Sequence, residues 1–222
     1  MIEPSFNLGD GNWAGKSGNL LGYHKISGNF YADDLTFTRA STGTIVNAEG
    51  LIESVASGMP RVDYLNNSNG SLLLEPQITN LVTYSEDLSN AAWSKLTNTT
   101  VNSNQAISPS GTLNADEFSA IATSTSLLAI QDGFSVSSGA NYTISFFAKK
   151  GSIKYIQLFN GSSQVTNNPR TNFDLENGTV YVSDANHNSS IEDYGNGWYR
   201  CSVSVLTAST TLQMYFNAVK DG

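Results

Sequence analysis

The stretch Phe173-Asp174-Leu175-Glu176-Asn177-Gly178-Thr179-Val180-Tyr181-Val182 carries the clearest structural signal of the sequence. Two segments rich in Phe, Thr, Val and Tyr flank the dipeptide Asn177-Gly178. Asn-Gly is the preferred centre of a two-residue type I′ hairpin turn, in which both residues need a positive φ. We therefore expect an antiparallel β-hairpin that turns at these two residues.

Short β-prone runs of the same kind recur along the chain, separated by Gly, Asn, Ser and Asp, and helical periodicity is almost absent. Only Ser85–Leu96 has a helix-like start, and there we expect a turn or one short helix. Many strands with short polar turns predict an all-β protein built as an antiparallel β-sandwich. The expected strands are Leu35–Arg39, Leu51–Val55, Arg61–Leu65, Ser71–Glu75, Asn141–Lys149, Ile153–Asn160, Thr171–Leu175, Thr179–Ser183, Trp198–Leu206 and Thr211–Asn217.

Composition narrows the class of protein. Of the 222 residues, 39% are hydrophobic, 10% aromatic and only 14% charged. The aromatic content excludes a disordered chain, and the low charge content excludes a coiled coil. Nineteen acidic residues against 11 basic ones give a net charge of −8, so we expect no nucleic-acid partner. No apolar run approaches the ~18 residues of a membrane span, so we expect no membrane insertion.

Cysteine use and the N-terminal sequence indicate where the chain is made. The single cysteine, Cys201, excludes an internal disulfide framework. The start Met1-Ile2-Glu3-Pro4 has neither the basic nor the apolar region of a secretory signal peptide. We expect synthesis in a reducing cytoplasm and stabilisation by packing alone.

A change in sequence character near residues 76–84 suggests two parts. Pro76 ends one run of strands, and a Ser-, Asn- and Thr-rich stretch follows. We expect residues 1–80 to form an irregular, partly β N-terminal adaptor or attachment arm, and residues 81–222 to form the sandwich.

Several short motifs, in their order along the chain, resemble a recurrent module of tailed-bacteriophage structural proteins. They are Thr36–Thr42 (Thr-Phe-Thr-Arg-Ala-Ser-Thr), Pro60–Tyr64, Leu72–Pro76, Thr79–Leu88, Phe146–Lys149, Phe173–Leu175 and Gly195–Cys201. The second part resembles concanavalin-A-like, carbohydrate-binding jelly rolls. Two features depart from the family pattern: Ile78 stands where a basic residue is usual, and the family's aromatic closing strand is missing after Gly222.

The resemblance implies a tail-fibre or head-fibre protein at the virion surface, made in the host cytoplasm, that contacts host surface glycans for attachment without catalysis. We also expect a homo-oligomer, a trimer, because the first part has more apolar runs, such as Leu72–Leu74, than it can bury alone, and because a sheet edge stays open after Thr211–Asn217. Fibre proteins of the resembled kind are commonly trimeric as well, and the N-terminal arm is expected to contact other virion proteins. One alternative is a purely structural virion subunit, as in a fibre, neck or capsid decoration, without glycan binding. The other is a polysaccharide depolymerase.

Glycan binding needs aromatic faces beside amide or carboxylate hydrogen-bonding groups. The sequence offers them mainly in one strand–loop region. Whether the Tyr155/Phe159 face points inward or outward stays open, and Trp198 is also a candidate core anchor. The candidate glycan-binding residues are Tyr155, Gln157, Phe159, Asn160, Gln164 and Trp198.

Four charged residues interrupt otherwise apolar runs of the first part: Arg39, Arg61, Asp63 and Glu75. Buried charges are normally paired. We therefore favour structural ion pairs that fix strand register over the alternative, a binding cleft.

The histidines and carboxylates of the sequence do not match the spacing of known catalytic motifs. The only two histidines, His24 and His187, have no Gly-x-Ser-x-Gly nucleophile turn to act with. Adjacent carboxylates such as Asp33-Asp34 point to opposite faces of a strand, which does not suit a glycosidase pair. We therefore expect no catalytic residues.

One loop has partial calcium-binding spacing. Asp184, Asn186 and Asn188 match the first three positions of an EF-hand loop, but Ser189 and Gly195 stand where Gly and Glu are required. We expect no metal ligands and no cofactor; a solvated turn is the favoured interpretation and a structural calcium ion the alternative.

Overall fold

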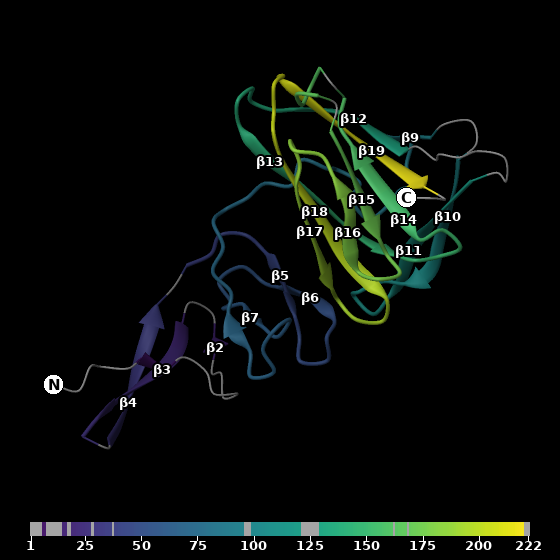
Figure 1. Cartoon of the computed structure of the whole chain (residues 1–222). Helices are drawn as coiled ribbons and strands as arrows, with labels where there is room; N and C mark the ends of the chain where they lie inside the picture. The colour runs from purple at the N-terminus through teal and green to yellow at the C-terminus, as the bar shows by residue number, and fades with distance from the viewer. Residues whose placement is uncertain are drawn as a thin grey trace. The chain divides into compact units, whose positions relative to one another are not determined.

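The structure, a computed structural model, describes residues 6–7, 15–16, 19–27, 29–36, 38–95, 99–120, 129–161, 163–167 and 169–219 (Figure 1). Within these ranges the regular structure is β throughout, and neighbouring strands pair antiparallel. The predicted all-β fold class is confirmed. Among the described residues no helix has the length and apolarity that a membrane crossing needs.

The chain divides into two compact units. Unit 1 comprises Met1–Ile78 with Pro109–Gly111, and unit 2 comprises Thr79–Ser108 with Thr112–Gly222.

Unit 1 consists of short antiparallel ladders. One sheet joins β1 (Phe6–Asn7), β3 (Asn19–Ile26) and β2 (Gly15–Lys16), with β4 (Asn29–Thr36) paired to β3. Two further pairs are β5 (Gly43–Val46) with β6 (Ile52–Val55), and β7 (Val62–Asp63) with β8 (Ser71–Leu72). Of the expected strand Leu35–Arg39, only Leu35 and Thr36 are in a strand, at the end of β4; residue 37 lies outside the described part, and Thr38 and Arg39 are not in a strand.

Unit 2 contains two larger sheets and one ribbon. The six-stranded sheet has the order β16 (Thr179–Ser183), β15 (Arg170–Asp174), β14 (Tyr155–Phe159), β19 (Thr211–Val219), β12 (Ala129–Ser135) and β9 (Trp93–Lys95). The three-stranded sheet has the order β13 (Asn141–Lys149), β18 (Trp198–Leu206) and β17 (Asn188–Asp193). The ribbon pairs β10 (Thr99–Ile107) with β11 (Leu113–Ala120).

The two larger sheets of unit 2 face each other across the hydrophobic core, as the layers in Figure 1 show. Phe146 of β13 meets Phe173 of β15 and Phe216 of β19 edge-on, with ring centroids 5.8 and 4.9 Å apart. Leu158 and Val203, from opposite sheets, are fully buried. Burial alternates along β18, as a strand with one core face requires. Unit 2 is therefore a β-sandwich.

The hairpin of β15 and β16 forms, but the type I′ prediction is wrong. Its loop has four residues, Leu175–Gly178, and Gly178 has a positive φ of 64° whereas Asn177 does not. The physical reason is Asp174, whose carboxylate accepts hydrogen bonds from the backbone N–H groups of Glu176 and Asn177. These bonds stabilise a longer loop than the Asn-Gly pair alone predicts.

Residues 83–92 form turns, as expected for the first part of Ser85–Leu96. The end of that segment is different, because Trp93–Lys95 form strand β9, and Leu96 is outside the described residues. Asp87 accepts hydrogen bonds from Ser89 and Asn90. The buried Trp93 donates from its indole N–H to the carbonyl of Tyr84 at 2.9 Å. This segment thus anchors the start of unit 2 to its core.

Candidate functional site

The core contacts of strand β14 determine the direction in which Tyr155 and Phe159 point. Ile156 and Leu158 pack into the core, so the alternating residues Tyr155, Gln157 and Phe159 lie on the outer face of the six-stranded sheet. The neighbouring strands add residues to this face in register with β14. We call the resulting set the aromatic–amide face: Tyr155, Gln157, Phe159, Asn172, Tyr181, Tyr215 and Asn217.

A ladder of three side-chain amides crosses the middle of this face. Gln157 lies opposite Asn172 on one side and Asn217 on the other. Asn217 donates from Nδ2 to Oε1 of Gln157 at 2.9 Å, and Gln157 donates from Nε2 to Oδ1 of Asn172 at 2.7 Å. The described residues provide no further partner for Nδ2 of Asn172 or Oδ1 of Asn217, so the ladder ends in a donor and an acceptor.

Aromatic pairs flank the ladder on both sides. Tyr155 and Tyr181 lie with ring centroids 5.0 Å apart, and Tyr181 is 51% exposed. Phe159 and Tyr215 stack with centroids 4.4 Å apart and planes 14° from parallel. Residues on one face of a strand repeat every ~6.6 Å, so ring surfaces stand about that far from the amides on either side. Aromatic and hydrogen-bonding groups thus alternate across this face.

Two carboxylates lie beside the face but are not tuned for acid catalysis. Nζ of Lys154 is 3.8 Å from Asp174 and 3.7 Å from Glu176. Burial raises the pKa of the Asp174 carboxyl, but hydrogen bonds from Asn177 and Glu176 outweigh burial and hold it below its ordinary value. A hydrogen bond from Lys150, with its charge, lowers the pKa of Glu176. A general acid needs the opposite shift.

The other three candidates for glycan binding lie in the interior. Asn160 is fully buried and donates from Nδ2 to the carbonyl of Gln213 at 2.6 Å. Gln164 is 7% exposed and donates to the Gln213 side chain at 2.7 Å. Trp198 is buried and donates from its indole N–H to the carbonyl of Ile107 at 2.9 Å. These three side chains therefore do not belong to the aromatic–amide face.

His187 is a buried structural residue of unit 2. Its Nε2 lies 3.0 Å from Oδ1 of Asn160 and its Nδ1 lies 2.9 Å from Oγ1 of Thr171. The hydroxyls of Ser183 and Ser189 complete the network around Thr171. Burial lowers the pKa of His187 to about 4, and the charge of Asp184 opposes this only in part. The ring is neutral at pH 7 and has both nitrogens engaged.

Cys201 does not supply an accessible nucleophile. His24 lies in β3, and its side chain is outside the described part. Cys201 is fully buried, and burial raises the pKa of its thiol to about 12. A thiol with this pKa is inert at neutral pH.

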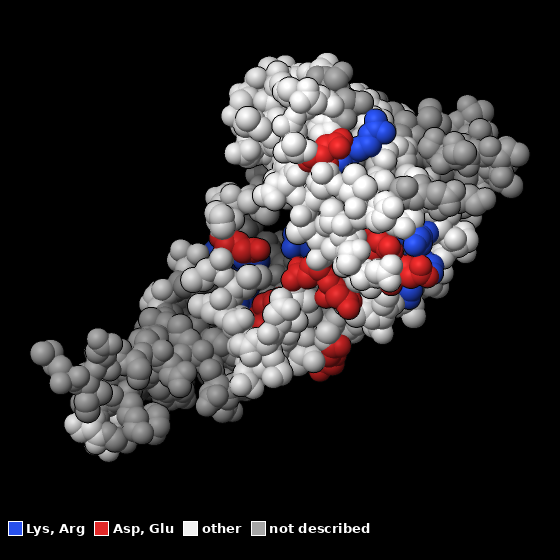
Figure 2. Space-filling view, in the orientation of Figure 1, with Lys and Arg blue, Asp and Glu red and all other residues white. Residues whose placement is uncertain are grey.

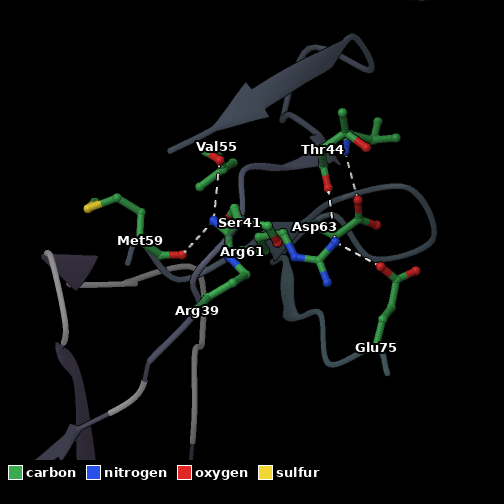
Figure 3. Close-up of polar contacts among 9 residues, drawn as sticks. Arg39, Ser41, Thr44, Val55, Met59, Arg61, Asp63 and Glu75 are labelled. Carbon is green, nitrogen blue, oxygen red and sulfur yellow. Dashed lines mark hydrogen bonds and ion pairs between the residues drawn. The ribbon is translucent and has the colours of Figure 1, made fainter. Parts of the chain in front are cut away.

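The four charged residues singled out in unit 1 fall into one ion pair and two backbone clamps (Figure 3). Arg61 pairs with Glu75 at 2.8 Å, Nη1 to Oε2, and Glu75 is 46% exposed. Asp63 accepts hydrogen bonds from the backbone N–H of Val46 at 2.7 Å and of Leu65 at 3.1 Å. Asp63 therefore fixes the chain between β5 and β7 through the backbone.

Arg39 holds several carbonyl groups with one guanidinium (Figure 3). Its Nη2 donates to the carbonyls of Val55, Ala56 and Met59 at 3.2, 2.6 and 3.1 Å, and its Nη1 donates to Ser41. Val55 is the last residue of β6, whereas Ala56 and Met59 lie beyond the β5–β6 pair, and the guanidinium gives all three carbonyls a charged hydrogen-bond donor. Arg39 thus replaces regular secondary structure in an irregular part of unit 1.

The partial calcium loop is a turn held by its own polar groups. Asp184 accepts from the backbone N–H of Arg170 at 2.9 Å, and Asn186 donates to the carbonyl of Thr166 at 2.6 Å. Across the described residues, His, Cys, Asp and Glu side chains form no group of three that suits a metal ion.

Charged side chains are sparse on the side of the molecule in Figure 2, where acidic and basic residues lie among a majority of uncharged ones. No protein-family model matches this chain, and no curated protein sequence matches it.

Sequence reasoning missed four members of the face: Asn172, Tyr181, Tyr215 and Asn217. Asn172 lies on β15 and Tyr215 and Asn217 lie on β19, and both strands pair directly with β14. Tyr181 lies on β16, which pairs with β15 through a bulge and not with β14.

Proposed function

We propose that this chain is a non-catalytic carbohydrate-binding protein of a phage virion surface and that its ligands are host surface glycans. The observation that carries the proposal is the amide ladder between two aromatic pairs on the outer face of the six-stranded sheet. Aromatic rings pack against the C–H faces of sugar rings, and amides both donate to and accept from sugar hydroxyls.

The geometry of the face also favours binding energetically. The Gln157 amide is fixed at both ends by hydrogen bonds, and Asn172 and Asn217 are each only 8% exposed. Little rotamer freedom is left to lose when a ligand binds. A fixed row of amides therefore supports recognition better than mobile surface side chains.

The virion part of the proposal rests on the motifs that resemble phage structural proteins, from Thr36–Thr42 to Gly195–Cys201. With it we propose a trimer that meets other virion proteins through unit 1. A structural subunit without glycan binding is the competing function, and the resemblance to fibre proteins favours it equally.

The absence of catalysis is part of the proposal. It is supported by the neutral, fully bonded His187 and by the lowered pKa values of Asp174 and Glu176. None of these groups is poised to exchange a proton with a substrate at neutral pH.

A glycan array and a product-release assay, run on the same preparation, test the proposal. We expect retention on host surface glycans without new reducing ends or unsaturated products. Turnover that scales with protein concentration identifies a depolymerase instead. Failure to bind any host glycan, with stable incorporation into particles, identifies a structural subunit.

A further inference from the structure

Unit 2 also has a hollow that shares no lining residue with the aromatic–amide face. It has a volume of about 250 Å³ and lies between the loop that precedes β15, the loop that precedes β17, and the outward side of β18. Its main lining residues are Val165, Thr166, Asn186, Asn188, Ser204 and Leu206.

Hydrogen bonds hold both loops of the hollow in place. Asn186 donates from Nδ2 to the carbonyl of Thr166 at 2.6 Å, which ties one loop to the other. The carbonyl of Gly161 accepts from the N–H of Val165 at 3.0 Å, and the N–H of His187 donates to the carbonyl of Asp184 at 2.9 Å. The hollow is therefore formed before any ligand arrives.

The buried side of the second loop is equally fixed. The His187 ring lies between Asn186 and Asn188 in the chain and is bonded to Asn160 and Thr171 beneath the surface. This anchor leaves Asn188, on the first position of β17, exposed toward the hollow. The partner position on β18 is Ser204, whose hydroxyl lies 2.7 Å from that of Thr143.

Backbone strain marks the same place. Asn167, directly after the lining residue Thr166, has a positive φ of 70°. Non-glycine residues adopt this conformation infrequently, and such strain concentrates at functional sites. Asn167 itself does not line the hollow, so the lining residues and not this backbone conformation define the site.

The chemistry of the lining selects the class of ligand. Four lining side chains carry hydroxyl or amide groups, Val165 and Leu206 are aliphatic, and no charged residue lines the hollow. Its volume is just below the ~300 Å³ at which pockets for drug-sized ligands begin. A single uncharged sugar ring offers both hydroxyls and an apolar C–H face on this scale.

The geometry points to a second ligand site, in which this hollow binds one uncharged sugar ring independently of the aromatic–amide face. The inference does not depend on the proposed function of that face. Hydroxyls of the sugar contact Asn188, Ser204 and Thr166, and its C–H face packs on Leu206.

Titration of ¹⁵N-labelled full-length protein, followed by backbone amide shifts, tests the site. The probes are the methyl α-glycosides of glucose, galactose, mannose and N-acetylglucosamine, with methyl α-glucuronide as the charged counterpart of the glucoside. We expect saturable shifts at Val165, Asn186 and Leu206 with at least one neutral glycoside, and weaker binding of the glucuronide.

Variants separate this site from the other face. Asn188→Ala removes a lining amide and is expected to weaken the saturating response by about tenfold, as the loss of about 1.4 kcal/mol does. Ser190→Ala, at the next outward position of β17, and Tyr181→Ala, on the aromatic–amide face, are expected to leave it unchanged. The inference is overturned if no neutral glycoside shifts the lining saturably, or if Ser190→Ala weakens the response as much as Asn188→Ala does.

Discussion

Gln157 and Asn172 face each other across strands β14 and β15, and the Nε2 of Gln157 donates to the Oδ1 of Asn172 at 2.7 Å. With Asn217 on the other side, this bond joins three side-chain amides into one ordered row, and two of them, Asn172 and Asn217, are only 8% exposed. The row gives the outer face of the six-stranded sheet fixed donors and acceptors between aromatic rings. The proposed glycan site depends on it.

Gln157→Met keeps the length of the side chain but removes both hydrogen bonds of the ladder. We expect a loss of about 2 kcal/mol in the free energy of unfolding, because two partners lose bonds worth about 1 kcal/mol each. We also expect about tenfold weaker glycan binding. Gln105→Met is the matched control, because Gln105 is exposed on β10 and donates only to the nearby carbonyl of Ser103. Urea unfolding and glycan titration measure both effects; equal behaviour of the two variants contradicts the role of the ladder.

Stability is expected to fall as the pH drops from about 6.5 to about 4 because of His187. The folded protein holds the pKa of this histidine at about 4, whereas the unfolded chain titrates near 6.5. The unfolded state therefore takes up the proton first, and the linkage amounts to about 3 kcal/mol across this window. His187→Gln removes the titrating ring, so its unfolding free energy at pH 4 and pH 7 should differ by less. An unchanged pH dependence in this variant argues against the buried neutral histidine.

Gly178→Ala tests the close packing of the β15–β16 loop. Gly178 has φ +64°, and an added Cβ lies 2.6 Å from Cε1 of Tyr199. We expect about 1–2 kcal/mol of loss from the left-handed backbone and about 1–3 kcal/mol more from the clash. Gly139→Ala, with φ +76° and open space around the Cβ, isolates the backbone part. Similar melting temperatures for the two variants would show that the Tyr199 contact adds nothing.

Arg39→Lys tests the carbonyl clamp of unit 1. Lysine lacks the planar fork that reaches Val55, Ala56 and Met59 together, so we expect a loss of about 1–3 kcal/mol. Glu75→Gln breaks only a partly exposed ion pair with Arg61 and is expected to cost at most about 1 kcal/mol. Hydrogen exchange at Gly58, whose N–H donates to the carbonyl of Arg39, reports the clamp directly. Faster exchange in Glu75→Gln than in Arg39→Lys contradicts this order.

Strands with an apolar face were readable from the sequence. Asn141–Lys149, Thr179–Ser183 and Trp198–Leu206 match β13, β16 and β18. Strand β10 (Thr99–Ile107) was missed because most of its residues are polar and exposed, so no alternation marks it. Its pairing with β11, rather than its own sequence, makes it a strand.

The aromatic–amide face could be predicted only in part, again because strand pairing leaves no local pattern in the sequence. The alternation of Tyr155, Gln157 and Phe159 placed them on one face, but the direction of that face depends on the core contacts of Ile156 and Leu158. The amide partners of Gln157 lie 15 and 60 positions away in the chain. Strand order and register bring them together, and a single sequence does not encode these in any local pattern.

Glycan binding by Tyr181→Ala, compared with Tyr84→Ala, tests the central proposal most directly. The two tyrosines are similarly exposed, at 51% and 46%, and both belong to unit 2, but only Tyr181 lies on the aromatic–amide face, against Tyr155. Calorimetric titration with the host glycan selected on the array is expected to show about two- to tenfold weaker binding for Tyr181→Ala and wild-type binding for Tyr84→Ala. A ring contact of this kind contributes about 0.5–1.5 kcal/mol. Wild-type affinity in Tyr181→Ala, or equal losses in both variants, would contradict the assignment of glycan recognition to this face.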